Sequence, residues 1–443
     1  MLRSLSTAVS GLRNHQNKLD VVGNNIANVN TVGYKSEMVR FQDIFSQMIK
    51  GANAPAAGRG GTNPVQVGLG MALGSTTTVH TGGAVTATER ETDLAIEGNG
   101  FFVVSDGTQN YYTRDGSFSR GYSGELLTSS GLKLMGWQAV KSYEDEDGRP
   151  IDPNVPGAIE VYKINTSDQL SEINIPLGEE LMAKSTENIS FAGNLDSGME
   201  VGGSHEYITY FYDSLGNRYN LIFEFTKSGE NKWDYEISFI DKEGERQEID
   251  KDNNESINFT PGGSFFDELA DPDDDPTIYS LAIDAGELGV GVGARDVHIT
   301  LDFSLLNQFS SPNSLTVKAQ DGYAAGELVS FNVEQSGVVT GSYSNGLNRI
   351  LGQVALASFS NPEGLMKAGS NLFDYTVNSG DPRIGVPGEM GRGLIQSRAL
   401  EMSNVDLAHE FTEMITTSRG YQANARVIST SDEVLTELIN IKR

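Results

Sequence analysis

Five histidines are the side chains best suited to acid–base chemistry at neutral pH, because imidazole titrates in that range without perturbation. They stand at positions 15, 80, 205, 298 and 409, and none belongs to an HExxH motif, a nucleophile elbow or a triad signature. Two Gly-rich stretches, GRGG at 58–61 and GVGVGARD near 290, lack the lysine and the strand–loop–helix setting of a phosphate-binding loop. A structural or surface role is the better interpretation of each histidine.

The 60 acidic residues give no evidence of catalysis, and the chain has no cysteine. So many carboxylates lie close to one another by composition alone, so their proximity in sequence carries no catalytic signal. Without cysteine there is no disulfide framework, thiolate metal site or cysteine nucleophile. The acidic runs containing Asp145 and Asp147 and the DPDDDP run at 271–276 lack the spacing of an EF-hand loop. We therefore expect no enzyme, no cofactor and no metal.

The net charge of −28 is concentrated in one part of the chain. Residues 165–315 hold 30 acids against 8 lysines and arginines, a balance of −22. Such a field repels phosphate backbones, so nucleic acid is not expected as a partner. The stretch is better explained as a solvated outer domain that is kept soluble by self-repulsion.

Length and hydropathy place the chain among multi-domain proteins without a membrane span. With 443 residues, 50 glycines and a mean hydropathy of −0.31, it is long enough for two or three cores and rich in turns. The opening MLRSLSTAVSGLRNHQNKLD is interrupted by charges and has no apolar centre. We therefore expect neither a cleaved Sec-type signal peptide nor insertion into a membrane.

The last forty residues carry the strongest periodic signal. Apolar or small residues form a stripe from Leu400 onward, and from Leu407 they recur at intervals of four and three, interrupted only by Asp432. This spacing keeps one stripe of a helix facing a partner helix, as in coiled coils. The N-terminus repeats the pattern at intervals of seven. Together these residues are named the terminal seam: Leu5, Leu12, Leu19, Ile26, Leu407, Phe411, Met414, Tyr421, Ala425, Ile428, Leu435 and Ile439.

Charge favours pairing of the two ends. Residues 1–35 are net positive by three and residues 400–443 are net negative by three, and opposite signs favour association and set register. The alternative is that both stripes are ordinary amphipathic helices packed on one globular core. The length of each stripe favours a partner outside the domain.

An Asn- and Gly-rich run, GNNIANVNTVGYK, follows the first helix. Its residues tolerate a left-handed backbone conformation and often terminate helices. The chain is therefore expected to turn there and to continue in an extended conformation. The run resembles the signature shared by the axial proteins of the bacterial flagellum, the rod and hook subunits. The residues that carry this resemblance are Asn24, Asn25, Ile26, Ala27, Asn28, Thr31, Gly33, Tyr34 and Lys35.

Residues 36–75 are interpreted as a connecting segment. Phe41, Ile44, Phe45, Met48 and Ile49 have helical spacing, and GANAPAAGRGGTNP is expected to form a loop. From about Gly74 the period changes to two, which predicts a β-meander, with Asp115-Gly116 as a hairpin signal. The segments DLAIEGNGFF and YTRDGSFS resemble the first β-domain of hook and distal rod proteins.

Two later stretches resemble the same proteins. FAGNLD and FYDSLGN resemble the outer domain of hook subunits, and the SNVDLA and GYQAN boxes resemble the axial C-terminus, with Ser403 or Asn404 as a plausible N-cap. The expected fold is mainly β with a terminal α-helical coiled coil, nested so that the terminal helices are innermost and the β-domains outward. The expected domains are helical 1–35 with 400–443, connecting 36–75, inner β 76–163 with 313–399, and outer acidic β 164–312.

The resemblance implies a structural, self-assembling subunit of the flagellar hook, a curved flexible tube that acts as a universal joint and transmits torque from rod to filament. It also implies export by the flagellar type III pathway, a location outside the inner membrane next to the basal body, and contacts with other copies and with rod, hook cap and hook–filament junction proteins. A distal rod or junction protein is the alternative within the family. A secreted β-rich adhesin with a coiled-coil stalk is the alternative outside it.

Overall fold

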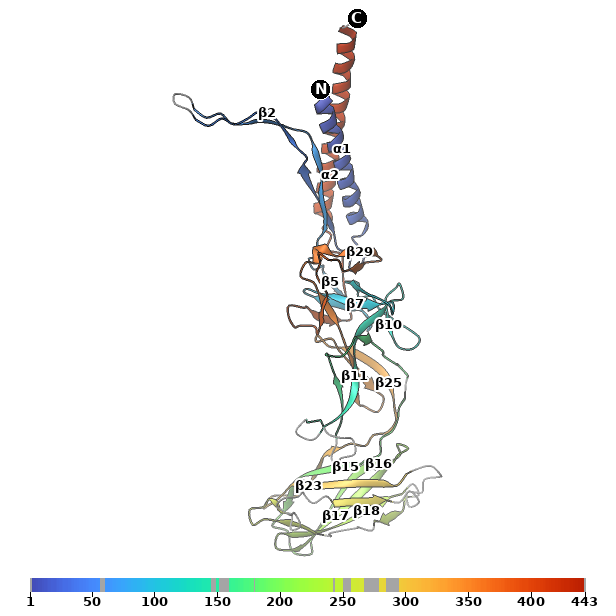
Figure 1. Cartoon of the computed structure of the whole chain (residues 1–443). Coiled ribbons are helices and arrows are strands. Elements are labelled where there is room, and N and C mark those ends of the chain that lie inside the picture. The colour runs from blue at the N-terminus through green and yellow to red at the C-terminus, as the bar shows by residue number, and fades with distance from the viewer. Residues whose placement is uncertain are drawn as a thin grey trace.

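The computed structural model describes residues 2–55, 60–144, 149–150, 159–178, 180–241, 244–249, 256–266, 279–283 and 295–441. Asp145, Asp147 and the DPDDDP run lie outside these residues, as does much of the two Gly-rich stretches. Figure 1 shows an elongated molecule in which a helix pair, an inner β-domain and an outer β-domain follow one another. The expected class, mainly β with a helix at each end, is confirmed.

Two long helices form one end of the molecule, α1 (Leu2–Ala27) and α2 (Leu407–Ile441). Asp406 caps α2, since its Oδ1 accepts from the backbone N–H groups of Ala408 at 2.8 Å and His409 at 3.2 Å. The prediction of Ser403 or Asn404 as the cap was therefore wrong. Leu400, where the helical stripe was expected to begin, lies in strand β33 (Ala399–Glu401). Within the part of the chain that the structure describes, neither helix is apolar enough to cross a membrane.

A β-ribbon, here named the arm, projects sideways from the helix pair (Figure 1). Its base pairs β1 (Glu37–Asp43) with β4 (Met71–Thr78), and its distal part pairs β2 (Ser46–Lys50) with β3 (Val65–Gly68). The helical spacing inferred for Phe41 to Ile49 was wrong, because Phe41 lies in β1, Met48 and Ile49 lie in β2, and Ile44 and Phe45 connect the two strands. The distal ribbon is exposed on both faces, so no alternation of buried and exposed residues marks it as a strand.

The inner β-domain is built on a sheet of fifteen strands among the described residues. Its core contains Phe102, Leu134 and Val354, all fully buried. The strands are β7 (Phe101–Ser105), β8 (Asn110–Thr113), β9 (Ser119–Arg120), β10 (Leu126–Leu127), β11 (Lys133–Glu144), β12 (Ile159–Ile164), β13 (Ser171–Glu172), β14 (Glu180–Leu181), β25 (Gly326–Val333), β26 (Val338–Tyr343), β27 (Asn348–Val354), β28 (Leu356–Ser358), β29 (Met366–Gly369), β30 (Leu372–Asp374) and β31 (Arg383–Gly385).

Early and late segments pair throughout the molecule. Nearest the helices, β5 (Val85–Ala87) pairs with β33, and β6 (Leu94–Glu97) pairs with β32 (Leu394–Ser397). Further out, β7 pairs with β28, β11 with β27 and β14 with β25. The chain therefore passes through each layer twice, once on the way out and once on the way back.

The outer β-domain consists of two sheets that share one aromatic core. Phe191, Phe223 and Trp233 are fully buried between them, as expected for a β-sandwich. One sheet contains β16 (Ser204–Tyr212), β17 (Arg218–Gly229), β18 (Lys232–Ile240), β19 (Arg246–Glu248), β20 (Ser256–Phe259) and β21 (Phe265–Phe266). The other contains β15 (Asn188–Asp196), β22 (Tyr279–Ile283), β23 (Val297–Phe309) and β24 (Thr316–Gln320).

Two local expectations differ from the structure. The outer domain was expected to span 164–312, but β13 and β14 pair with the inner sheet and β24 pairs with the outer one. Asp115-Gly116 does not form a hairpin, because β8 pairs with β7 and β30 rather than with β9. A Cβ on Gly116 would lie 1.6 Å from the carbonyl oxygen of Leu94, so glycine serves close packing there rather than a two-residue turn.

Candidate functional site

The Asn-rich run ends α1 by means of its own side chains. Asn28 Nδ2 donates to the backbone oxygen of Asn24 at 2.9 Å and to its Oδ1 at 2.7 Å. The hydroxyl of Thr31 donates to Asn28 Oδ1 at 3.1 Å. Ile26 and Ala27 lie in the last turn of the helix. These short polar side chains compete with the helical backbone for hydrogen bonds, so the chain turns here.

Asn25 is the buried side chain at which the helix pair meets the base of the arm. Its Nδ2 donates to the backbone oxygen of Glu37 at 2.9 Å and to Glu410 Oε1 at 3.1 Å. Its Oδ1 accepts from Glu37 N at 3.0 Å and from the Tyr34 hydroxyl at 3.2 Å. Burial raises the pKa of Tyr34 to about 12, so the phenol remains a donor. An amide is required here because it offers donors and acceptors at one planar end.

At Gly33, the backbone of the Asn- and Gly-rich run contacts the inner β-domain. Its φ is +68°, a left-handed conformation that side chains disfavour. A Cβ at this position would lie 2.6 Å from the backbone nitrogen of Asp115, in the YTRDG segment. Its own N–H donates to the backbone oxygen of Glu401 at 2.8 Å. Three segments far apart in the sequence therefore meet at one glycine.

Glu401 lies between two buried cations. Its Oε1 is 2.6 Å from Lys35 Nζ, and its Oε2 is 3.1 Å from Arg114 Nη1. Gly83 N also donates to Oε1, at 2.9 Å, and Lys35 Nζ donates to the backbone oxygen of Thr81 at 2.8 Å. Burial lowers the pKa of the Lys35 ammonium, and the charge of Glu401 opposes that shift. A buried charge triad of this kind fixes the geometry of the groups that it joins.

Further contacts that the sequence did not reveal are made at the base of the arm. Asn404, which was expected to cap α2, instead accepts from Ser36 N at 2.8 Å and donates to the backbone oxygen of Val79 at 2.8 Å. Lys367 pairs with Glu37 at 2.5 Å. Arg114 and Asn404 stand in the recognised YTRDG and SNVDLA motifs, but their partners are far away in sequence and no local rule identifies them.

The two helices pack antiparallel, as the order of their contacts shows. Gly11 faces Asn424, His15 faces Gly420 and Asn25 binds Glu410, so residue numbers rise along one helix and fall along the other. A Cβ on Gly11 would lie 2.7 Å from the Asn424 amide. Lys18 forms an ion pair with Glu413. The intrachain contact therefore uses small and polar residues at several points.

The terminal seam is divided by this packing. Leu5, Leu12, Leu19 and Ile26 are half-buried, and so are Met414, Tyr421, Ala425, Ile428 and Leu435. Leu407, Phe411 and Ile439 remain exposed, and Phe411 keeps 50% of its accessible surface. Ile415 and Val427 are exposed as well. The single chain thus leaves an apolar face of α2 uncovered.

The arm leaves a second apolar surface uncovered. Phe45 is 72% exposed, Ile49 is 62% exposed, and Met48, Val65 and Val67 are exposed as well. A surface with this many large apolar side chains normally marks a contact with another molecule. Such a ribbon gains little stability from its own chain, since a two-stranded hairpin is marginal in water.

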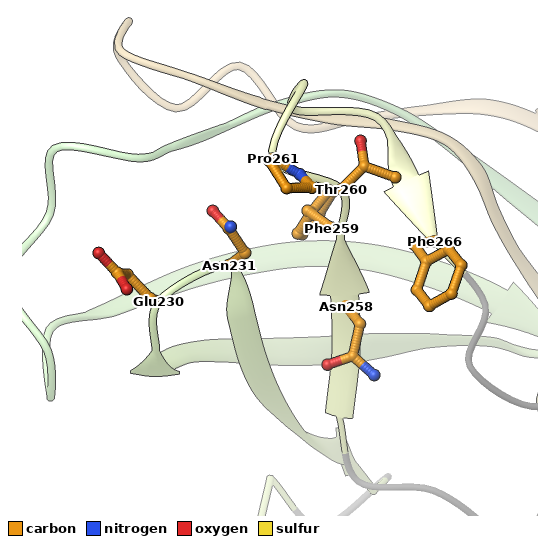
Figure 2. A pocket seen from close by; sticks show the side chains of 7 residues that line it. All are labelled: Glu230, Asn231, Asn258, Phe259, Thr260, Pro261 and Phe266. Carbon is orange, nitrogen blue, oxygen red and sulfur yellow. The ribbon is translucent and has the colours of Figure 1, made fainter.

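A pocket of about 390 Å³ lies on the outer domain (Figure 2). Glu230 is the only ionisable side chain among its lining residues, so the lining offers no acid–base pair. The lining consists of Glu230, Asn231, Asn258, Phe259, Thr260, Pro261 and Phe266. The buried junction and the exposed apolar surfaces are therefore the stronger functional candidates.

Four family models match the chain in succession. Residues 5–35 match the flagella basal body rod protein, and residues 95–190 match the flagellar hook protein FlgE/F/G D1 domain. Residues 185–323 match the flagellar basal body protein FlaE D2 domain, and residues 396–441 match the flagellar basal body rod FlgEFG protein C-terminal. The limits of the D2 match agree with the strand pairing that separates the inner and outer β-domains.

Individual relatives match over the full length. The chain is 40% identical to the flagellar hook protein FlgE of Borreliella burgdorferi, with all of both chains covered. It is 30% identical to the flagellar basal-body rod protein FlgG of Bacillus subtilis, again over all of both chains. The crystal structure of Helicobacter pylori flagellar hook protein FlgE2 has a similar fold, with a TM-score of 0.53 at 14% identity, over 72% of this chain and 100% of that one.

Proposed function

The chain belongs to the flagellar hook protein family, and on that premise we propose that its exposed apolar surfaces join copies of it into the tube of the hook. It is a structural subunit of the bacterial flagellum. The observation that carries the proposal is the uncovered face of α2 with Leu407, Phe411 and Ile439. Water-exposed leucine and phenylalanine on a long helix favour burial against another helix.

A repeated contact between two different surfaces of the same molecule builds a tube. If the face of α2 binds a different surface on the next copy, the contact is heterologous and propagates without closing on itself. The arm supplies a second such surface at a distance from the helices (Figure 1). Two separate contacts on one subunit are sufficient to define a helical lattice.

The division of the molecule suggests a division of labour. The terminal helices would line the interior of the tube and give it axial stiffness, while the β-domains would lie outside and change their spacing as the tube bends. This arrangement would let the hook act as a universal joint between rod and filament. The polar, acidic faces of neighbouring outer domains would slide past one another at a low cost in free energy, because hydrated charged contacts rearrange more readily than apolar ones.

Partners and delivery follow from the same proposal. Other copies of the chain are the main partner, and rod, hook cap and hook–filament junction proteins would contact the ends of the tube. Export would use the flagellar type III apparatus. The relatives are named as hook and rod proteins, and this supports a role without catalysis. A rod subunit is the second candidate, since a rod protein matches the full chain. Electron microscopy of assembled protein separates a straight rod from a curved hook.

The test is Phe411→Asp, because Phe411 lies on the uncovered face of α2. A charge there should prevent tube formation while the β-domains stay folded, which sedimentation and circular dichroism measure. Thr412→Asp changes an exposed neighbour on the same helix and should still assemble. Ile428→Asp, at a half-buried position, should abolish assembly too, but it should also disturb the helix pair. Normal tubes from Phe411→Asp would overturn the proposal.

A further inference from the structure

Two antiparallel segments connect the inner and outer β-domains, residues 182–187 on the way out and 320–326 on the return. They are named the linkers. Lys184 N donates to the backbone oxygen of Tyr323 at 3.1 Å, and Tyr323 N donates to that of Lys184 at 3.0 Å. On the inner side Leu181 pairs with Gly326, and on the outer side Ile189 pairs with Gln320. The connection is thus a two-stranded ribbon rather than two loose loops.

Asp321 fastens the outer half of this ribbon. Its Oδ1 accepts from the backbone N–H groups of Glu187 at 2.9 Å and Asn188 at 3.0 Å. Its Oδ2 accepts from Asn188 Nδ2 at 3.2 Å and lies 3.0 Å from Lys184 Nζ. One carboxylate thereby uses both oxygens to tie the returning linker to the outgoing one.

Thr186 fastens the ribbon to strand β16. Its side chain is fully buried, and its N–H donates to the backbone oxygen of Tyr212 at 2.9 Å. Its Oγ1 accepts from Tyr212 N at 2.9 Å and from Gln320 Nε2 at 3.0 Å. A Cβ on Gly322 would lie 2.1 Å from that hydroxyl, so the linkers cross in close contact. Up to the Lys184–Tyr323 pair, the ribbon therefore moves with the outer domain.

The backbone hydrogen-bond ladder of the linkers is interrupted between the Lys184–Tyr323 pair and the inner sheet. Residues 182–183 and 324–325 lie in the interruption and are named the pivot. Met182 is 84% exposed. On the inner side, Asn345 Nδ2 donates to the backbone oxygen of Ala324 at 2.9 Å. Rotation of the outer domain therefore concentrates at two residues of each linker, as in other hinges where few residues absorb the change in dihedral angles.

The turn between β16 and β17 lies against the pivot. Residues 213–217, named the stop, are closed by buried Asp213, whose Oδ1 accepts from Leu215 N at 2.9 Å and Asn217 N at 2.8 Å. Gly216 has φ +81°, and a Cβ there would lie 2.8 Å from the Cβ of Ala183 and 3.2 Å from the backbone nitrogen of Ala325. The stop is thus a rigid turn in contact with both pivot segments.

We propose that the pivot is a one-sided hinge. The stop prevents the outer domain from rotating toward the linkers, because that movement would press backbone against backbone. Rotation in the opposite direction is resisted at the pivot by the hydrogen bond from Asn345 to Ala324. The outer domains of neighbouring copies could then spread apart from a fixed minimum spacing without losing their own packing.

The test measures the distance between the domains in the full-length monomer, so its result does not depend on polymerisation. The chain has no cysteine, so spin labels on Ile208→Cys in the outer domain and Val329→Cys in the inner domain report one distance. Both positions are exposed. A one-sided hinge predicts a distance distribution with a sharp limit on one side and a tail on the other. A symmetric distribution would overturn the proposal.

Two glycine variants distinguish an effect of the stop from a general effect of backbone strain. Gly216→Ala adds a methyl group against Ala183 and should shift the mean distance. Gly202→Ala is the matched control, because Gly202 has φ +88° with open space around its Cβ position, so both variants strain the backbone alike. Asn345→Ala should lengthen the tail and leave the sharp limit in place. Equal effects of the two glycine variants, or no effect of Asn345→Ala, would contradict the hinge.

Discussion

Glu401 lies against both Lys35 and Arg114, and the three side chains are at most 3% exposed. Replacing it with glutamine removes the charge and leaves two buried cations without an anion. Breaking a buried ion pair in this way costs about 3–5 kcal/mol. We therefore expect Glu401→Gln to lower the free energy of unfolding by that order, measured by urea denaturation of the monomer.

The control for this variant is Glu91→Gln. Glu91 pairs with Arg398 at 2.5 Å, but their side chains are 34% and 53% exposed. An exposed pair contributes less than about 1 kcal/mol, so this variant should unfold close to the wild type. If Glu401→Gln were as mild as Glu91→Gln, the buried triad would not hold the junction together.

His80 makes the same junction sensitive to acid. Its ring lies 5.5 Å from the ring of Phe101 and 5.3 Å from that of Phe373, measured between centroids. Burial lowers its pKa from 6.5 to about 4, and the charges of Lys35, Arg114 and Lys367 add to the shift. Between these two pH values the unfolded chain binds a proton that the folded chain does not, so stability falls as the pH falls.

The size of this effect gives a prediction for His80→Phe. A shift from 6.5 to about 4 corresponds to at most about 3 kcal/mol. The variant keeps an aromatic ring in the site and has nothing to protonate. We expect it to lose less stability than the wild type between pH 7 and pH 4, measured by urea denaturation at both values. His298→Gln, at an exposed position, should keep the wild-type acid loss. Equal acid losses for His80→Phe and wild type would exclude His80 as the source.

At the scale of elements, the two helices could be predicted because their periodicity and their end signals are local. The end of α1 follows from Asn28 and Gly33, which stand just beyond its last residue and favour non-helical backbone. The start of α2 could not be placed, because Asn404 and Asp406 are both good capping residues. Only the fold decides between them, since the amide of Asn404 is occupied by Val79 and Ser36.

The terminal seam shows the limit of periodicity more sharply. A repeat of four and three defines which residues share a face but not which face meets which partner. Met414 and Tyr421 are half-buried, whereas Leu407 and Phe411 are exposed. The intrachain contact uses Gly11, which has no hydrophobic signal at all. A search for apolar residues therefore did not find every residue of the buried contact between the helices.

The arm yields a prediction of its own, because its apolar side chains are exposed and support no core. Phe45→Ser combined with Ile49→Ser should change the free energy of unfolding by less than about 0.5 kcal/mol, as for surface substitutions in general. Assembly should nevertheless become slower or stop, measured by light scattering. Gln47→Ser, on the same ribbon, should assemble normally. A large loss of monomer stability in the double variant would mean that the arm packs on its own chain.

At the scale of the whole molecule, charge acts differently at the two ends of the long axis. The terminal segments carry +3 and −3 and attract each other, whereas residues 165–315 carry −22 and repel their counterparts on neighbouring copies. Salt weakens both effects, since the screening length falls from about 30 Å at 0.01 M to about 8 Å at 0.15 M. The larger charge should dominate, so salt should accelerate assembly of the full chain.

Removing the outer domain should weaken this dependence on salt. Residues 185–322 can be replaced by Asn-Gly, because Lys184 and Tyr323 are already paired through their backbones, and a two-residue turn of this kind suits an antiparallel pair. The inner core should persist, since it forms a cluster separate from the outer one. The shortened chain keeps a net charge of −9, against −28 for the full chain, so salt should accelerate its assembly less, measured by light scattering. If salt accelerated both chains equally, the repulsion would arise elsewhere than in the outer domain.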